Sequence, residues 1–298
     1  MEILKTKKLT KYYGKTKGIV DLNLEIQKGE IFGFIGPNGA GKSTTIRLLM
    51  QLIFPSSGNF TLFGQQIKGE NPTIRQRIGY LPSEINFYHE LTGKQLLELS
   101  AKLYELPTAQ IEELSELLEL DLTKTVKSYS LGNRKKLAII QSLLHEPELL
   151  ILDEPTSGLD PLIQSRFFEL LKEKNAQGMT IFLSTHVLSE VEKLCHRVGI
   201  IREGRLINLS SVAELPGRAE RIVEVRYEED GDLREKYSFA QIDPSVRYTD
   251  GIHSFHVQSH LHEALAAIAQ HPISDIIIKQ PSLEELFMKY YGRGEDPK

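Results

Sequence analysis

Residues 36–43 read Gly36-Pro-Asn-Gly-Ala-Gly-Lys-Ser43, a complete G-x-x-x-x-G-K-S phosphate-binding loop. The short apolar run Ile31 to Ile35 comes before it and predicts a buried strand, and Thr44 to Phe54 follows with a helical spacing of apolar residues. The loop glycines let successive N–H groups point at phosphate oxygens, and the positive end of the helix favours the same charge. The sequence therefore predicts a nucleotide-phosphate site, with a glycine-rich turn that binds nothing as the alternative.

Two residues of this loop have predicted ligands. Lys42 is expected to reach the β- and γ-phosphates, and Ser43 to place its hydroxyl on Mg²⁺. Further along, Leu149-Leu-Ile-Leu-Asp-Glu154 predicts a buried strand that ends in two carboxylates. We expect Asp153 to hold Mg²⁺ through its water shell and Glu154 to reach an attacking water. Capping of the next turn, or an ion pair, is the alternative for these two acids.

The elements around these motifs predict an α/β fold. A third buried strand is expected over Thr180 to Ser184, and helices over Leu162 to Lys174 and Leu188 to Cys195, which favours a mainly parallel sheet. A leucine- and glutamate-rich stretch from Leu91 to Leu120 predicts a helical insertion broken at Pro107. Ser130 precedes another helix, whose start either attracts an anion or is simply capped by the serine.

Composition excludes several classes of protein. The chain has 298 residues, which suggests about two domains, and its 40% hydrophobic and 26% charged residues exclude wholesale disorder. The single cysteine, Cys195, cannot form an intrachain disulfide. A net charge of −4 gives no reason to expect a nucleic-acid partner. We also expect no membrane-spanning helix and no signal peptide, because the sequence has no apolar run of the required length.

A second domain is expected after the breaker cluster Leu215-Pro216-Gly217. The pattern that follows suggests a small α+β domain of the ferredoxin-like kind. Its predicted elements are a strand over Ile222–Tyr227, a hairpin at Asp250-Gly251, a helix over Leu261–Gln270, a strand over Ile276–Ile278 and a helix over Leu283–Tyr290. Four histidines crowd this region, but their spacing matches no recognised metal site, so we favour a non-ligand role for His253, His256, His260 and His262.

Taken together, the motifs resemble the ATP-binding subunit of ATP-binding-cassette (ABC) transporters, of the exporter type that carries a C-terminal accessory domain. The resemblance covers the whole chain. It rests on the phosphate-binding loop, on the strand that ends at Glu154, and on four further motifs: Tyr129-Ser-Leu-Gly-Asn133, Ser157-Gly-Leu-Asp160, Ser184-Thr-His186 and the closing Pro281-Ser-Leu-Glu-Glu-Leu-Phe287.

The resemblance implies a P-loop NTPase cassette with a mostly parallel sheet, an antiparallel β subdomain and a helical insertion, followed by a small C-terminal α+β domain. The corresponding boundaries are 1–213 for the ATP-binding domain, with the insertion at about 84–145, and 214–298 for the accessory domain. The insertion is what the resemblance assigns to contact with a membrane subunit.

The resemblance also implies roles for individual residues. Tyr13, with Tyr12 as its rival, would stack on adenine. The phosphates would be cradled by Gly36, Pro37, Asn38, Gly39, Ala40, Gly41, Lys42, Ser43 and Thr44. Asp153 would assist Mg²⁺, Glu154 would be the general base, and His186 would bond the γ-phosphate and the water. Asp160 would communicate between subunits, and the γ-phosphate of ATP held by the other subunit would contact Ser130, Gly132 and Asn133.

The sequence departs from the family pattern at two places. The family commonly has Leu-Ser-Gly-Gly-Gln where this chain has Tyr129-Ser-Leu-Gly-Asn133, so Leu131 adds a side chain where close backbone approach is usual. The family usually has a glutamine after Tyr-Leu-Pro, where this chain has Ser83 followed by Glu84.

The function implied is that of an ATPase with ATP and Mg²⁺ as cofactors, which forms a dimer, expected to be a homodimer, around ATP. It would energise a membrane permease and lie on the cytoplasmic side of the cell membrane, held by that partner. Two alternatives remain: a soluble cassette ATPase that acts as a mechanical switch on ribosomes or nucleic acid, and a nucleotide-binding regulator that does not hydrolyse ATP.

Overall fold

The computed structural model describes residues 1–106, 108–214, 220–257 and 260–281. Four predicted features lie wholly or mostly outside these residues: the break at Pro107, the cluster Leu215–Gly217, the helix Leu283–Tyr290 and the motif that begins at Pro281. The chain divides into two compact units, Met1–Val212 and Ala213–Lys298, with a boundary one residue before the predicted one. Among the described residues, no helix is long and apolar enough to cross a bilayer.

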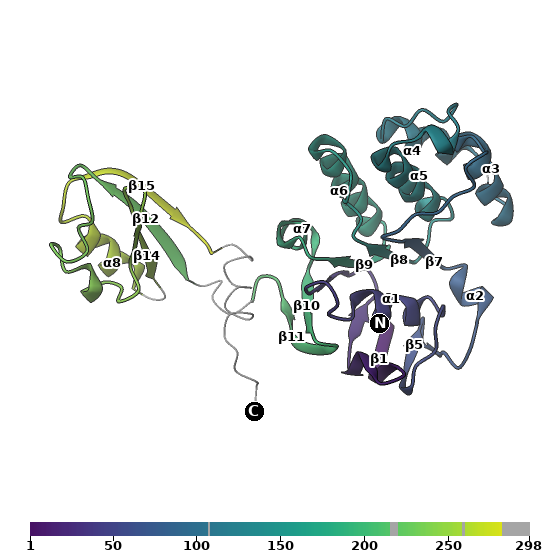
Figure 1. Ribbon diagram of the computed structural model, residues 1–298, viewed down its shortest axis with the longest axis horizontal. Coiled ribbons are helices and arrows are strands. Elements are labelled where there is room, and N and C mark those ends of the chain that lie inside the picture. The colour runs from purple at the N-terminus through teal and green to yellow at the C-terminus, as the bar shows by residue number, and fades with distance from the viewer. Residues whose placement is uncertain (107, 215–219, 258–259, 282–298) are drawn as a thin grey trace. The chain divides into compact units, whose positions relative to one another are not determined.

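The first unit contains an antiparallel sheet and a mostly parallel sheet (Figure 1). The antiparallel sheet has the order β2-β1-β5-β6, with β3 also paired to β1; its strands are β1 (Glu2–Tyr13), β2 (Thr16–Leu22), β3 (Glu25–Gln27), β5 (Ser57–Leu62) and β6 (Gln65–Gln66). The other sheet has the order β11-β10-β4-β9-β8-β7, comprising β4 (Ile31–Ile35), β7 (Ile78–Leu81), β8 (Leu149–Asp153), β9 (Thr180–Thr185), β10 (Arg197–Arg202) and β11 (Arg205–Ser211).

The main core of this unit joins the two sheets through α1 (Lys42–Leu49). Side chains from the antiparallel sheet, such as Leu4 and Phe60, belong to one buried cluster with Ile46 of α1 and with Phe32 and Phe182 of the parallel sheet. Strands β4, β8 and β9 are buried at every residue, because helices or the other sheet cover both of their faces. The phosphate-binding loop therefore connects a buried strand to a helix that is buried on one face.

The predicted strands β4, β8 and β9 are confirmed to within one residue, and so is a helix start near Lys42, but α1 ends earlier than predicted. It starts at Lys42 because the loop leads directly into the first turn. It stops at Leu49 instead of Phe54 because Gln51 takes a left-handed conformation with φ of 58°.

Helices α3 (Gly93–Leu103), α4 (Ala109–Leu117) and α5 (Leu131–Leu143) gather at one end of the first unit, away from β1 and β5 (Figure 1). The predicted helical insertion is confirmed, as two helices followed by a third. Thr92 and Gln95 form a reciprocal capping box that starts α3. The remaining helical elements of this unit are α2 (Pro72–Arg75), α3 (Gly93–Leu103), α4 (Ala109–Leu117), the 3-10 helix Val126–Ser128, α5 (Leu131–Leu143), α6 (Pro161–Ala176) and α7 (Leu188–Leu194).

The second unit is a four-stranded antiparallel sheet with one α-helix among its described residues. Its strands run in the order β13-β14-β12-β15, which is the pairing of a split βαβ fold. A 3-10 helix over Phe239–Gln241 stands where that pattern has its first helix. The predicted hairpin is confirmed at Asp250 and Gly251, which both have positive φ. The elements are β12 (Arg221–Tyr227), β13 (Arg247–Thr249), β14 (Ile252–Val257), α8 (Leu261–Ile268) and β15 (Ile273–Lys279).

Candidate nucleotide-binding and catalytic site

The phosphate-binding loop requires glycine at position 41. Gly41 has φ of 111°, and a Cβ there would lie 2.8 Å from the carbonyl oxygen of Gly18. The next residue, Lys42, is 7% exposed, and its Nζ donates to the carbonyl of Gly36 at 2.6 Å and to that of Pro37 at 3.3 Å. The ammonium group therefore lies folded over the loop, where its donors are available to an anion held there.

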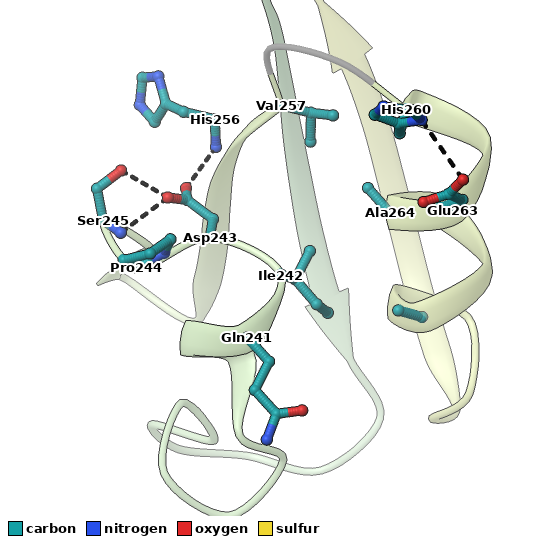
Figure 2. Close-up of a pocket in the computed structure, with 11 residues that line it drawn as sticks. Gln241, Ile242, Asp243, Pro244, Ser245, His256, Val257, His260, Glu263 and Ala264 are labelled. Carbon is teal, nitrogen blue, oxygen red and sulfur yellow. Dashed lines mark hydrogen bonds and ion pairs between the residues drawn. The ribbon is translucent and has the colours of Figure 1, made fainter.

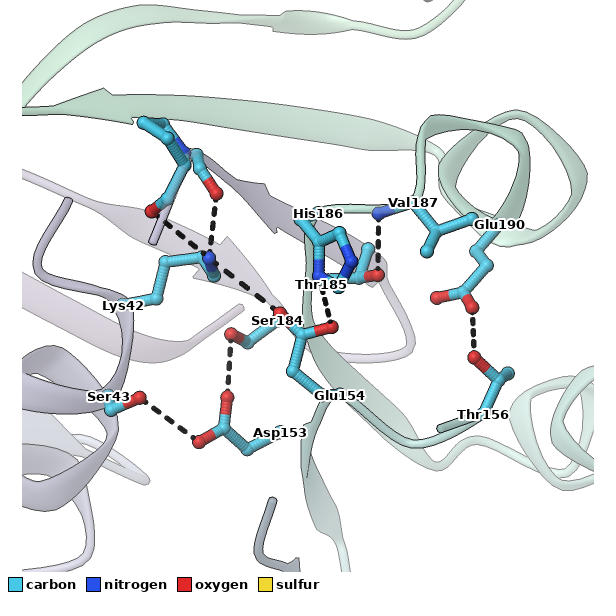
Figure 3. Close-up of polar contacts among 12 residues, drawn as sticks. Lys42, Ser43, Asp153, Glu154, Thr156, Ser184, Thr185, His186, Val187 and Glu190 are labelled. Atoms are coloured by element: carbon cyan, nitrogen blue, oxygen red, sulfur yellow. Dashed lines mark hydrogen bonds and ion pairs between the residues drawn. The ribbon is translucent and has the colours of Figure 1, made fainter. Parts of the chain in front are cut away.

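Asp153, at the end of β8, joins the loop to β9 (Figure 3). Its Oδ2 accepts a hydrogen bond from Ser43 Oγ at 3.3 Å, and its Oδ1 accepts one from Ser184 Oγ at 2.9 Å. A hydroxyl and a carboxylate are hard oxygen donors of the kind that Mg²⁺ prefers. The chemistry of these donors therefore fits a magnesium ion between Ser43 and Asp153.

Glu154 follows in a left-handed conformation with φ of 50°, which is costly for a residue other than glycine. One carboxylate oxygen lies 2.7 Å from His186 Nδ1 and the other 3.7 Å from Lys42 Nζ (Figure 3). Its backbone N–H donates to the carbonyl of Ser184 at 2.9 Å. The carboxylate is thus held between an imidazole and an ammonium group, and it is 20% exposed.

Lys42, Ser43, Asp153 and Glu154 line one pocket of about 350 Å³. Of the two tyrosines considered for adenine stacking, Tyr13 lines this pocket. Ser83, which stands where the family has glutamine, also lies on its wall. The complete lining is Tyr13, Lys17, Gly18, Pro37, Asn38, Gly39, Gly41, Lys42, Ser43, Thr44, Ser83, Asp153 and Glu154. Ala40 is buried and Gly36 supplies the carbonyl that Lys42 contacts.

Five other predicted site residues do not line this pocket. His186 contacts it through Glu154, and the other four are Ser130, Gly132, Asn133 and Asp160. Ser130 caps α5 by accepting a hydrogen bond from Asn133 N at 3.2 Å. Asp160 caps α6 by accepting one from Ile163 N at 3.0 Å, and this bond lowers the pKa of Asp160. Within a single chain, both residues therefore serve as helix caps.

Close packing joins the start of α5 to the loop before α6. A Cβ on Gly132 would lie 2.7 Å from the carbonyl oxygen of Gly158, so this position requires glycine. The side chain of Leu131 covers Gly158, where an added Cβ would lie 3.0 Å from Leu131 Cγ, yet Leu131 remains 57% exposed. The departure from the family pattern at residue 131 therefore presents an apolar group at the exposed start of a helix.

Two buried charged residues near the site were missed by motif analysis. Lys135 is 1% exposed, and burial lowers the pKa of its ammonium group. Glu190 is 4% exposed and accepts a hydrogen bond from Thr156; burial raises the pKa of its carboxyl group. The available signal for Lys135 was its position in α5, where Ala138 and Ile139, three and four residues later, are both buried.

The second unit has a pocket of its own, of about 500 Å³ (Figure 2). Its buried carboxylate, Asp243, is already bonded within the chain, because it accepts from the N–H and the hydroxyl of Ser245, both at 2.7 Å, and from His256 N at 2.6 Å. Nearby His253 is buried and its Nε2 accepts from Leu233 N at 3.0 Å. The first-unit pocket, where the sequence motifs converge, is therefore the candidate functional site.

Comparison with known proteins identifies the family. The model of the ABC transporter family matches residues 19–157. The chain is 38% identical to the bacitracin transport ATP-binding protein BcrA of Bacillus licheniformis, over 98% of both chains. It is 34% identical to the linearmycin resistance ATP-binding protein LnrL of Bacillus subtilis, over 98% of this chain and 99% of that protein.

A solved structure of the ATP-binding subunit of an ABC transporter matches the fold. It superimposes with a TM-score of 0.66 at 33% identity, and covers 72% of this chain and 91% of its own. The fold and the sequence relatives agree with the site described above. The chain therefore belongs to the ABC transporter family, as an ATP-binding and ATP-hydrolysing subunit that powers a membrane transporter.

Proposed function

We propose that this subunit binds Mg²⁺-ATP in the first-unit pocket and uses Glu154 as the general base that activates water for hydrolysis. The observation that carries the proposal is the convergence of Lys42, Ser43, Asp153 and Glu154 on one pocket, with His186 at the Glu154 carboxylate. General acid-base catalysis requires a carboxylate of this kind within hydrogen-bond reach of the water.

Lys42 and the loop amides supply the positive side of the site. Lys42 Nζ carries three donors, and it exchanges the carbonyls of Gly36 and Pro37 for phosphate oxygens when ATP enters. Its move also leaves the Glu154 carboxylate, 3.7 Å away, free to accept a hydrogen bond from water. A bound magnesium ion would be held by Ser43 and Asp153 and would neutralise phosphate charge.

His186 orients the proposed base. Its Nδ1 lies 2.7 Å from a Glu154 carboxylate oxygen, and its ring is 60% exposed and so accessible to a γ-phosphate. In the proposed arrangement, His186 therefore contacts both the Glu154 carboxylate and the nucleotide. Tyr13, on the wall of the same pocket, is the proposed stacking partner of the adenine.

We also propose that two copies of the chain close around ATP, each contributing Ser130, Gly132 and Asn133 to the nucleotide of the other. Support comes from the position of these residues: they lie outside the pocket of their own chain, at a helix start that attracts anions. Ser130 and Leu131 are exposed and hence accessible to a second chain. Asp160 would carry the signal between the subunits.

Export is the proposed direction of transport. The relatives that match over nearly the whole chain are named for bacitracin transport and for linearmycin resistance, and another full-length relative, of Mycobacterium tuberculosis, is named for fluoroquinolone export. The subunit would act at the cytoplasmic face of the membrane through a permease that contacts the insertion of helices α3 and α4. Removal of the γ-phosphate would open the dimer and pass the movement to that permease.

Substitution of Glu154 by glutamine tests the catalytic proposal. Glu154→Gln removes the base but keeps the shape of the side chain, so we expect ATP binding to persist while the rate of phosphate release falls roughly 10²–10⁴-fold, about 3–5 kcal/mol of barrier. Size-exclusion chromatography of this variant with Mg²⁺-ATP should show a dimer.

Glu203→Gln is the matched control, because Glu203 also has φ of 50° but its side chain is 84% exposed and does not line the pocket. It should hydrolyse ATP at the wild-type rate. A Glu154→Gln variant that releases phosphate as fast as this control would remove Glu154 from the proposed role.

A further inference from the structure

Lys135 is an unusual core residue, because its side chain is charged and only 1% exposed. It lies in the second turn of α5, the helix that begins next to Ser130. Lysine is rarely buried so completely, because removing an ammonium group from water is costly unless strong acceptors replace the solvent. Its acceptors therefore indicate why a lysine stands at this position.

The acceptors of Lys135 are two backbone carbonyls, one of a pocket residue and one of the residue before a pocket residue. Its Nζ donates to the carbonyl oxygen of Glu154 at 3.0 Å and to that of Pro82 at 3.5 Å. Glu154 is the proposed general base, and Pro82 immediately precedes Ser83, which lines the pocket. One buried ammonium group thus joins α5 to both of these segments.

Lys135 contacts Glu154 at a residue whose backbone conformation is unfavourable on its own. Glu154 has φ of 50°, a left-handed conformation that persists in such residues only when the surrounding structure enforces it. Its N–H is held by the carbonyl of Ser184 at 2.9 Å, and its carbonyl by Lys135. These two bonds fix the peptide groups on both sides of the residue and so determine where its carboxylate points.

We propose that Lys135 is a positioning residue for Glu154: its ammonium group holds the Glu154 carbonyl and so keeps the left-handed backbone that turns the carboxylate into the nucleotide pocket. The inference rests on the proposed role of Glu154 as general base. Lys135 does not line the pocket, so it acts on hydrolysis through Glu154 and not by contact with ATP.

The substitution Lys135→Met in the full-length chain tests this role. Methionine keeps most of the aliphatic side chain but has no donor. We expect kcat for ATP hydrolysis to fall about 10–100-fold, because displacement of a catalytic group by as little as an ångström is enough for such a loss. The dissociation constant for ATP, measured by equilibrium binding, should stay within about twofold of the wild-type value, since the phosphate-binding loop is untouched.

Lys136→Met is the matched control. Lys136 is the next residue of α5, is 9% exposed, and donates from Nζ to a backbone carbonyl as well, that of Glu119 at 3.4 Å. It does not contact Glu154, so we expect the melting temperature to fall as in Lys135→Met while kcat stays near the wild-type value. An equal loss of kcat in both variants would overturn the inference, because it would mean that any buried lysine of α5 serves only stability.

A double-mutant cycle with Glu154→Gln separates this inference from the proposed function. If Lys135 acts through Glu154, Lys135→Met has no further effect on the residual rate of Glu154→Gln. A slow Glu154→Gln together with a wild-type kcat for Lys135→Met would overturn the inference and leave the proposed function intact. A fast Glu154→Gln would overturn the proposed function itself.

A second substitution covers the case in which Lys135→Met does not fold. Glutamine has a donor, but its side chain is one bond shorter, so Lys135→Gln cannot reach the Glu154 carbonyl from the same backbone position. We expect the same fall in kcat with unchanged ATP binding. A folded Lys135→Gln with wild-type kcat would contradict the inference equally.

Discussion

Gly41 and Glu154, which both line the nucleotide pocket, adopt backbone conformations that few side chains tolerate. Gly41 has φ of 111° at the start of α1, and Glu154 has φ of 50° after β8. Gly41 tolerates its conformation because it has no side chain. Glu154 is held in its conformation by two hydrogen bonds: Lys135 donates to its carbonyl, and its N–H donates to the carbonyl of Ser184. The pocket thus combines one position where a Cβ is excluded with one where a strained residue is held in place.

Gly41→Ala should destabilise the protein even without nucleotide. The new Cβ would lie 2.8 Å from both the carbonyl oxygen of Gly18 and Cγ2 of Ile19, in addition to the unfavourable φ. We expect a loss of about 2–4 kcal/mol in the free energy of unfolding, measured by urea titration.

Gly39→Ala provides the comparison for the steric contribution. Gly39 has φ of 80°, but a Cβ there would meet no atom within 4 Å. The free energy of unfolding of this variant should therefore fall by about 1–2 kcal/mol, which is the cost of the backbone conformation alone. If Gly41→Ala and Gly39→Ala lose the same free energy of unfolding, the contact of the new Cβ with Gly18 has no energetic consequence.

The residues of the site that the sequence reveals are those in contiguous motifs. Lys42, Ser43, Asp153 and Glu154 could be predicted because short runs of sequence specify both a strand end and the polar group that follows it. Lys135 was missed, because a lysine in a helix is usually exposed. Its spacing from Ala138 and Ile139 hints at burial, but the tertiary structure is needed to place its ammonium group at the Glu154 carbonyl.

Among the secondary structure elements, the buried strands were predicted more accurately than the ends of the helices. Strand β4 is apolar along its whole length and is bounded by polar or turn residues, so its limits are visible in the sequence. The end of α1 depends on Gln51, whose left-handed conformation has no marker comparable to a glycine. The apolar residues Met50 and Ile53 continue the helical spacing past Leu49, the last residue of α1, and so favour a longer helix.

His145 connects two helices of the insertion to the parallel sheet. It follows α5, its ring stacks on Tyr104 after α3 with centroids 4.4 Å apart, and its Nε2 lies 3.1 Å from the carbonyl oxygen of Ile78 in β7. Burial lowers the pKa of His145 below its ordinary value of 6.5. The neutral ring is consequently the form that supports this junction.

The first unit should lose stability through His145 as the pH falls below about 6.5. In that range the unfolded chain binds a proton that the folded chain excludes, so the stabilisation present above pH 6.5 is lost progressively towards the lower folded pKa. His145→Gln keeps an amide donor for Ile78 but cannot take up the proton. Its melting temperature relative to wild type, measured between pH 5 and 8, should therefore rise as the pH falls.

His89→Gln serves as the control for this pH dependence, because His89 is exposed. Its melting temperature should follow the wild-type curve across the whole range. If His145→Gln also follows the wild-type curve, the buried ring does not contribute to the acid sensitivity of the junction.

The whole molecule consists of two units with separate cores. The core that surrounds α1 contains only residues of Met1–Val212, and the core of the second unit is formed by residues such as Val223, Phe239 and Phe255. The residues that line the nucleotide pocket all belong to the first unit. Each unit therefore has its own hydrophobic driving force for folding.

A chain of residues 1–212 should fold and bind ATP on its own. We expect a cooperative thermal transition by circular dichroism and a dissociation constant for ATP within about threefold of that of the full chain, because no pocket residue is removed. A chain of residues 1–195 is the control. It lacks β10, which pairs with β4 beside the phosphate-binding loop, and it should not fold. An unfolded 1–212 would contradict the independence of the two units.

The order of the strands could not be predicted from the sequence. The expected parallel sheet is confirmed, but nothing local indicates that β10 and β9 lie on either side of β4, or that β1 pairs with β2, β3 and β5 together. Strand pairing depends on which apolar faces are covered after all elements have assembled. The pattern of strand-like and helical runs in the second unit favours an α+β domain, yet its 3-10 helix at Phe239 has no sequence marker.

The position of β4 in the sheet has a consequence for biosynthesis. Its two neighbours, β9 and β10, lie between residues 180 and 202, so the ribosome must make most of the first unit before Ile31–Ile35 can pair with either. At elongation rates of about 5–20 residues per second, this delay is on the order of ten seconds. During that interval the nascent strand, apolar along its whole length, has no partner and needs protection from aggregation.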